Sequence, residues 1–309
     1  MSIKKPINSF VYGMGSFFNI FNTEHKQCLN EVIKNKIKIH SSIYYPGSAF
    51  FFRNVVPENV RNNVNLIVKV SGYNYDQFRY ELDQSFNSFK TKKFYGVQFW
   101  DELPFLKANN IDYHELEKIL GYVDELKKDH IIQKLFLQIN HKKMRLEEDK
   151  IYNLFDGFAF NAYPNEAQID EGNFRYILKN NKISLQLQFF GGRYKSNFRE
   201  NYLEKDSSKI KQKNWINKCI EYSINTFGEN SFFVGSTRNL NRLKLTLELL
   251  NNDPKKKNQD TRFLKDCYLI APRDYSIESH KDDLAKLTGN FYLVKQYLVR
   301  LIKKILFLR

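Results

Sequence analysis

Eight short β-rich runs recur along the chain, and segments with helical spacing separate them. The runs are SFVYGMG (9–15), IKIHSS (37–42), NLIVKVS (65–71), YGVQFW (95–100), LFLQIN (135–140), GFAFNAY (157–163), ISLQLQFF (183–190) and SFFVGS (231–236). Strands that alternate with helices predict a parallel sheet with helical crossovers. Eight such units in about 250 residues match the usual size of a closed barrel. The sequence therefore predicts an α/β protein with a (β/α)8 TIM barrel.

The clearest helical segment between two runs is HELEKILGYVDELKKD (114–129), whose apolar residues follow the spacing of a core-facing helix. These residues are Leu116, Ile119, Leu120, Val123 and Leu126. Between the seventh and eighth runs, residues 191–215 are polar and charged. We predict a mobile loop there, over the mouth of the barrel, before a helix near 216–226.

A polar stretch, NNDPKKKNQDTR (251–262), predicts a boundary between a barrel at 1–250 and a basic extension at 251–309. Residues 284–309 contain six basic residues and no acid, and their large aliphatic side chains recur at helical spacing. This pattern is typical of a basic amphipathic helix, which binds an anionic membrane surface through residues 290–309 or docks on the barrel. Nucleic acid is not expected, because the cations share the helix with large aliphatics.

Composition limits the compartment and the partners. The three cysteines, Cys28, Cys219 and Cys267, are scattered, which fits a reducing cytoplasm and gives no zinc pattern, so we expect no metal. We find no signal peptide and no apolar run near the ~20 residues of a spanning helix. The net charge of +15 favours an anionic partner, such as a metabolite or the inner face of a membrane, or reflects lysine usage throughout the chain.

Several pieces of the chain, in order, resemble the aldo-keto reductase superfamily. VYGMGSF resembles the first strand of that family, KIHSSIYYPGS (38–48) the second strand with the loop of the catalytic tyrosine, and NLIVKVSG the strand of the catalytic lysine. FRYELDQSFNSFKTKKFYGVQFWDE resembles the helix and the fourth strand that ends in the catalytic histidine, and VGSTRNLNRL resembles the segment that binds the cofactor phosphate. The resemblance covers residues 9–250 and implies a barrel that moves hydride between NADP(H) or NAD(H) and a carbonyl.

The resemblance implies a catalytic set that is half replaced. Tyr45 matches the acid/base tyrosine, and Lys69 matches the lysine that lowers the pKa of that tyrosine. His40 stands at the position of the family's acid, five residues before Tyr45, and Trp100 stands at the position of the fourth-strand histidine. A tyrosine with a reference pKa near ~10 must be tuned downward to exchange a proton at neutral pH. His40 offers a hydrogen bond to this pair but no permanent negative charge.

The positions that the resemblance assigns to the cofactor have also changed. Gln138, with Leu137 before it, takes the place of the Ser-Asn pair that holds the nicotinamide amide. Ser236, Arg238 and Arg242 remain in the phosphate segment. Two arginines beside a strand-to-helix turn suit a phosphate or another anion.

Two functions stay open at this point. One is an aldo/keto reductase-like oxidoreductase with weakened catalysis on a polar carbonyl or a sugar, for which Trp100 offers a flat apolar face. The other is a repurposed barrel that binds a small anionic ligand or a protein partner without chemistry. Ordinary packing also explains Tyr44 and Tyr45 on such a loop, and a register shift of one residue would turn Lys69 to the other face of its strand.

Overall fold

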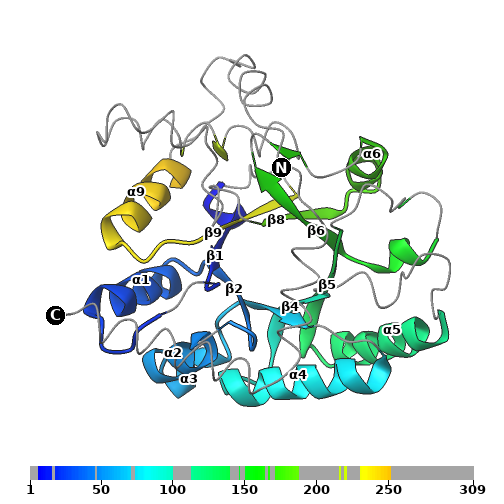
Figure 1. The fold of residues 1–309 in the computed structure, drawn as a ribbon, viewed down its shortest axis with the longest axis horizontal. Helices are drawn as coiled ribbons and strands as arrows, with labels where there is room; N and C mark the ends of the chain where they lie inside the picture. Colours follow the sequence, from blue (N-terminus) through cyan, green and yellow to red (C-terminus); the bar gives the residue numbers. More distant parts are fainter. Residues whose placement is uncertain are drawn as a thin grey trace, which may run out of the picture.

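The computed structural model describes residues 6–15, 18–45, 47–70, 74–99, 113–139, 146, 150–163, 166–167, 171–187, 216, 219–220 and 230–251. Within these residues, eight parallel strands close into a barrel (Figure 1). The barrel strands are β1 (Phe10–Gly13), β2 (Lys38–Ser42), β3 (Leu66–Val70), β4 (Phe94–Phe99), β5 (Ile132–Gln138), β6 (Gly157–Tyr163), β8 (Ile183–Leu187) and β9 (Ser231–Gly235). The predicted (β/α)8 fold is confirmed.

The strands follow one another around the barrel in chain order, and β9 returns to pair with β1. A short strand, β7 (Glu166–Ala167), pairs antiparallel with the end of β6 and lies outside this order. Each predicted run overlaps one barrel strand, but the fifth strand begins at Ile132, three residues before the predicted start. The reason is pairing: Ile132 lies opposite Phe94 of β4, so the strand extends as far as its neighbour does.

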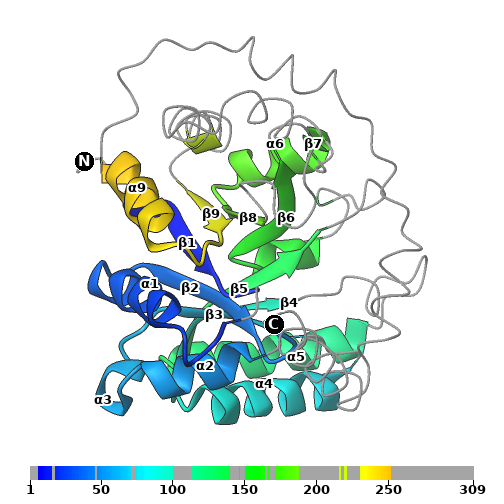
Figure 2. The same cartoon turned by 60° about the vertical axis from the view of Figure 1, so that its left-hand side comes forward.

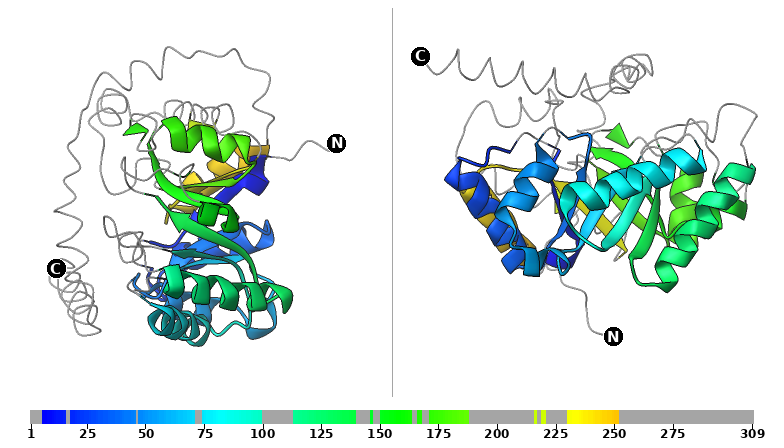
Figure 3. Two further views of the ribbon diagram at one scale, coloured as in Figure 1. Left: turned by 90° about the vertical axis from the view of Figure 1, so that its right-hand side faces the viewer. Right: turned by 90° about the horizontal axis from the view of Figure 1, so that it is seen from below.

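Helices cover the outside of the barrel and connect successive strands. They are α1 (Thr23–Lys34), α2 (Ser48–Val55), α3 (Glu58–Arg61), α4 (Tyr75–Phe89), α5 (Tyr113–Lys128), α6 (Glu171–Lys179) and α9 (Leu240–Asn251), with 3-10 turns η1 (Pro6–Ser9) and η2 (Lys150–Leu154). Figure 2 shows α4 and α5 side by side beneath β3 to β5, and the right panel of Figure 3 shows the same layer from below. The predicted helix at 114–129 is α5.

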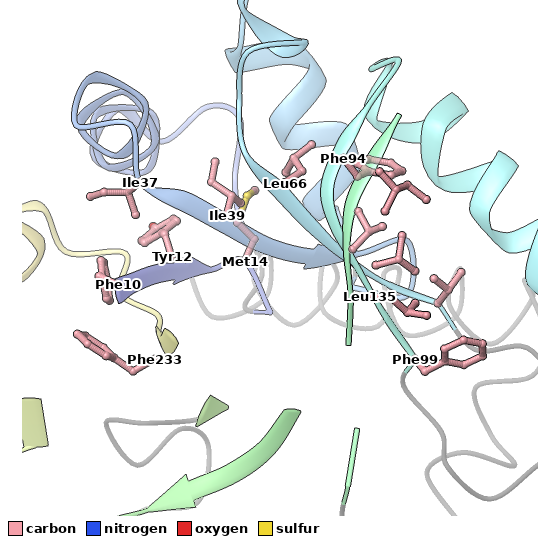
Figure 4. Close-up of a cluster of buried hydrophobic side chains, with 14 of the residues drawn as sticks. Phe10, Tyr12, Met14, Ile37, Ile39, Leu66, Phe94, Phe99, Leu135 and Phe233 are labelled. Carbon is pink, nitrogen blue, oxygen red and sulfur yellow. The ribbon is translucent and has the colours of Figure 1, made fainter. Parts of the chain in front are cut away.

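Most apolar side chains lie in an outer core between the strands and the helices (Figure 4). Asn22 and Asn74 start α1 and α4, because each side chain accepts a hydrogen bond from a first-turn backbone N–H. Phe99 illustrates the packing, since its ring stacks on Phe78 of α4 with centroids 4.9 Å apart. The outer core therefore fixes how each strand is rotated about its own axis.

A second, smaller core fills the inside of the barrel. Its buried residues come from six of the eight strands: Val11, Ile67, Phe136, Ala159, Leu185, Leu187, Phe232 and Val234. Because side chains alternate along a strand, the residue two positions after an inward one also points inward. Ile67 is followed in this way by Lys69, and Phe136 by Gln138. The interior therefore changes from apolar to polar toward the carboxyl ends of β3 and β5.

Some predictions fall on residues outside the described ranges. They include Trp100, the whole loop at 191–215, most of the helix predicted after it, and the extension from residue 252 onward. Of the predicted helix at 216–226, Ile216, Cys219 and Ile220 are helical. Within the described ranges, no helix is long and apolar enough to cross a membrane.

Candidate active site

The loop after β2 is tied to β3 by one serine. The Ser42 hydroxyl donates to the carbonyl oxygen of Lys69 at 3.3 Å and accepts from the backbone N–H of Tyr44 at 3.2 Å. The backbone N–H of Tyr45 donates to the carbonyl oxygen of Ser42 at 3.1 Å. These bonds explain the serine at the end of KIHSS, because Ser42 holds the turn that carries Tyr45.

Tyr45 and Lys69 lie together at the carboxyl ends of adjacent strands, as predicted. The Lys69 ammonium nitrogen is 5.7 Å from the centroid of the Tyr45 ring, within the range of a cation–π contact. Lys69 is only 9% exposed. The flanking residues Val68 and Val70 pack in the outer core, so Lys69 points into the barrel and not toward solvent. Its strand register is therefore the one that the catalytic interpretation requires.

A chain of three buried polar side chains crosses the barrel interior next to this pair. His40 Nε2 lies 2.7 Å from Gln98 Oε1, and Gln98 Nε2 donates to Gln138 Oε1 at 2.8 Å. The three residues come from β2, β4 and β5, and each is at most 3% exposed. The His40 ring centroid is 6.5 Å from that of Tyr45. The candidate site thus contains Tyr45, Lys69, His40, Gln98 and Gln138.

Two atoms at the ends of this chain have no hydrogen-bond partner among the described residues. They are His40 Nδ1 and the amide nitrogen of Gln138. A buried polar group without a partner is destabilising, so such atoms commonly mark the place of a water or a ligand. The site therefore offers an acceptor at one end and a donor at the other.

His40 is neutral in this environment. Burial and, to a smaller extent, the charge of Lys69 lower the pKa of His40 to about 3, although the hydrogen bond to Gln98 acts in the opposite direction. A neutral imidazole does not compensate the charge of Lys69, whereas a carboxylate at the same position would. The prediction that His40 adds no permanent negative charge is consistent with this geometry.

This buried histidine predicts a pH-dependent stability. Between the folded pKa of about 3 and the ordinary value of 6.5, the unfolded chain binds one proton more at this residue than the folded chain does. Stability at this site therefore rises with pH over that window. We expect His40→Gln to reduce the slope of the unfolding free energy by about 1.4 kcal/mol per pH unit between about pH 4 and about pH 6. Urea denaturation over a pH series measures this slope.

The matched control for that measurement is His114→Gln, since His114 is exposed on α5. Its slope is expected to equal that of the unmodified protein. Equal slopes for both variants would contradict a buried neutral His40.

The segment with the two arginines lies at the carboxyl end of β9. Ser236, Arg238 and Arg242 are exposed there, at the strand end and in the first turn of α9. The buried Tyr12 hydroxyl donates to the carbonyl oxygen of Thr237 at 2.6 Å and anchors the turn from the β1 side. Burial raises the pKa of Tyr12, so this hydroxyl remains a donor.

The N-terminus of α9 is capped by side chains of this chain. The backbone N–H of Arg242 donates to Asn239 Oδ1, and that of Leu240 donates to Glu24 Oε1, both at 2.9 Å. Two of the backbone donors that suit an anion at a helix start are thus already engaged. An anion at this segment would depend mainly on the arginine side chains.

Sequence reasoning missed Gln98, because the resemblance placed the fourth-strand position on Trp100. A glutamine inside an otherwise apolar strand was the available signal, since buried polar side chains are normally hydrogen-bonded.

Among the described residues no three side chains that could bind a metal ion lie close together.

The comparison with solved structures supports this architecture. No protein-family model matches the sequence, and no curated protein matches it. Among solved structures, the aldo/keto reductase from Klebsiella pneumoniae in complex with NADP and acetate has a TM-score of 0.63 at 10% identity, over 86% of this chain and 93% of that chain.

Two further solved structures give the same result. The aldose reductase from Giardia lamblia has a TM-score of 0.59 at 8% identity, over 87% of this chain and 94% of that chain. An aldo-keto reductase enzyme from a Medee basin deep-sea metagenome library has a TM-score of 0.57 at 10% identity, over 86% and 92%. The protein is thus a (β/α)8 barrel whose interior is polar toward the carboxyl ends of β3 and β5. Its fold is that of the aldo/keto reductases, so the resemblance seen in the sequence is confirmed at the level of the fold.

Proposed function

We propose that this protein is an aldo/keto reductase-like oxidoreductase with weakened catalysis, acting with NADP(H) or NAD(H) on a polar carbonyl or sugar. The observation that supports it most is the pairing of Tyr45 with Lys69 at the carboxyl end of the barrel, where TIM barrels carry their active sites. The solved structure from Klebsiella pneumoniae, which has the same fold, contains NADP.

The residues present fit a nicotinamide cofactor at two places. The amide nitrogen of Gln138, which has no hydrogen-bond partner within the described ranges, suits the carbonyl oxygen of a carboxamide. Arg238 and Arg242 suit the phosphates of a dinucleotide. In the barrel order, β5 and β9 are separated by β6 and β8, so a ligand that reaches both places must extend along the mouth.

Each residue of the site has a defined task in this proposal. The bound cofactor supplies or accepts the hydride. In the reducing direction the Tyr45 hydroxyl gives its proton to the carbonyl oxygen of the substrate, and the Lys69 ammonium stabilises the phenolate that remains. Water then returns a proton to the phenolate. Because His40 is neutral, no carboxylate from this position tunes the Lys69–Tyr45 pair, and we expect slow turnover.

A second function, binding without turnover, is favoured by the same neutral His40. The barrel would then hold an anionic or polar ligand at its mouth while no hydride moves. The extension at 251–309 gives this alternative a further element, since its basic amphipathic pattern suits the inner surface of an anionic membrane in the cytoplasm.

Cofactor binding is tested by titrating the purified protein with NADPH and with NADH while following the fluorescence of the reduced nicotinamide. We expect saturable binding, and about 10-fold weaker binding for Gln138→Leu, because one hydrogen bond to the carboxamide is lost. Gln186→Leu is the matched control, since Gln186 is a buried glutamine on β8 that bonds Ser184 instead. Its affinity is expected to remain unchanged.

Three outcomes separate the alternatives. A protein that binds neither nucleotide cannot be a reductase of this kind. Binding followed by oxidation of NADPH in the presence of aldehydes or keto-sugars supports the oxidoreductase. Binding without any oxidation supports the barrel that binds without turnover.

A further inference from the structure

Gln98 connects two buried side chains that the strands alone do not bring into contact. It lies on β4, and its neighbours Val97 and Phe99 pack in the outer core, so its amide points into the barrel. Its amide nitrogen donates to Gln138 Oε1 at 2.8 Å, which sets the orientation of the amide group. The other end of the amide, Oε1, therefore faces His40 Nε2 at 2.7 Å.

The orientation of this amide decides the protonation of the histidine. A carboxamide oxygen accepts hydrogen bonds and never donates them. A contact of 2.7 Å between this oxygen and His40 Nε2 thus requires a proton on Nε2. In a neutral imidazole the other nitrogen, Nδ1, then carries a lone pair.

We propose that Gln98 is a positioning residue that holds His40 as the neutral Nε2–H tautomer and thereby presents the Nδ1 lone pair as a fixed acceptor inside the barrel. Gln138 supports this arrangement, because its Oε1 holds the amide of Gln98 in one orientation. Gln138 on β5 thus orients Gln98 on β4, and Gln98 in turn orients His40 on β2.

The tautomer itself concerns only side chains of this chain and does not depend on a cofactor. Its consequence for chemistry rests on the proposed function. The ring centroids of His40 and Tyr45 are 6.5 Å apart. At this distance a fixed acceptor on His40 accepts a hydrogen bond from a hydroxyl group of the substrate, or from a water that hydrates the Tyr45–Lys69 pair. In the opposite tautomer, an N–H would point into the site in its place and repel these donors.

The test uses the full chain labelled with 15N in its histidines and long-range 1H–15N correlation spectra, which distinguish the two neutral tautomers and the cation. The chain has six histidines, and the His40 signals are assigned by their loss in His40→Gln. We expect His40 to show the pure Nε2–H pattern, unchanged from about pH 5 to about pH 8.

Two variants change the group that Gln98 presents. Gln98→Met removes the acceptor, so the Nδ1–H tautomer is expected to gain population. Gln98→Glu places a carboxylate against Nε2–H and stabilises the imidazolium, so the His40 signals are expected to titrate within the measured range. Gln186→Met is the control for removing a buried glutamine from the sheet and is expected to leave the His40 spectrum unchanged.

Far-ultraviolet circular dichroism checks that each variant folds. An Nδ1–H pattern in the unmodified protein would overturn the proposal even if every variant failed to fold. An unchanged His40 spectrum in folded Gln98→Met would also overturn it. Neither result depends on nucleotide binding, so failure here is distinguishable from failure of the proposed function.

Discussion

Replacing Tyr45 with phenylalanine is expected to lower the rate of NADPH-linked carbonyl reduction by ~100 to 10,000-fold, the usual contribution of a positioned general acid. The substitution removes only the hydroxyl oxygen and keeps the ring that lies against Lys69. The proton donor is therefore lost while the packing of the loop is kept. Steady-state oxidation of NADPH with a panel of aldehydes and keto-sugars measures the change.

Tyr44→Phe is the matched control, because it removes the same hydroxyl from the neighbouring position of the same loop. Its rate is expected to stay within about twofold of the unmodified protein, since no role in proton transfer falls on Tyr44. Equal turnover in Tyr45→Phe and the unmodified protein would exclude Tyr45 as the acid. A complete absence of turnover in all three proteins would favour the barrel that binds without chemistry.

The second large effect is expected at Gly157, at the start of β6. A Cβ atom added there would stand 2.3 Å from the carbonyl oxygen of Ile183 and 2.8 Å from its Cβ. Ile183 is the strand partner of Gly157, so relief of this contact requires the backbones of β6 and β8 to separate. We expect Gly157→Ala to destabilise the protein by about 3 kcal/mol, as is typical of overpacking at a rigid position.

Gly121→Ala provides the opposite control for the same substitution. Gly121 lies in α5, and an added Cβ atom there would meet nothing within 4 Å. Because alanine favours the helix, this variant is expected to gain about 1 kcal/mol. Denaturant midpoints for the two variants measure the contrast, and similar midpoints would show that β6 and β8 adjust easily.

The barrel could be predicted from the sequence because its strands are short, apolar and evenly separated by helices. The alternation along each strand carries the information, as in LIVKV, where Lys69 interrupts the apolar residues of β3 at an inward position. Together with the turn residues after β2, this alternation predicts Tyr45 and Lys69 at the same end of the barrel. The local pattern was sufficient for both residues, since they lie on adjacent strands.

The partner of His40 could not be predicted in the same way. Gln98 is 58 residues further along the chain and lies two strands away, so their contact depends on the tilt and stagger of the closed barrel. A glutamine in a buried strand indicates that some partner exists without identifying it. Glu24 presents the same difficulty, because an acid in the first turn of α1 gives no sign that it caps α9.

The contacts between the first and the last elements of the barrel affect the order in which the chain can fold. Tyr12 reaches Thr237 across 225 residues, Leu240 reaches Glu24 across 216, and β1 pairs with β9. Until the ribosome has released α9, the first strand lacks one of its two neighbours and remains an open edge. Closing so large a loop slows folding, since the entropy of the chain is lost before these contacts form. The first strand, although it precedes its partner β9 in the chain, is therefore among the last strands to be protected from pairing with other chains.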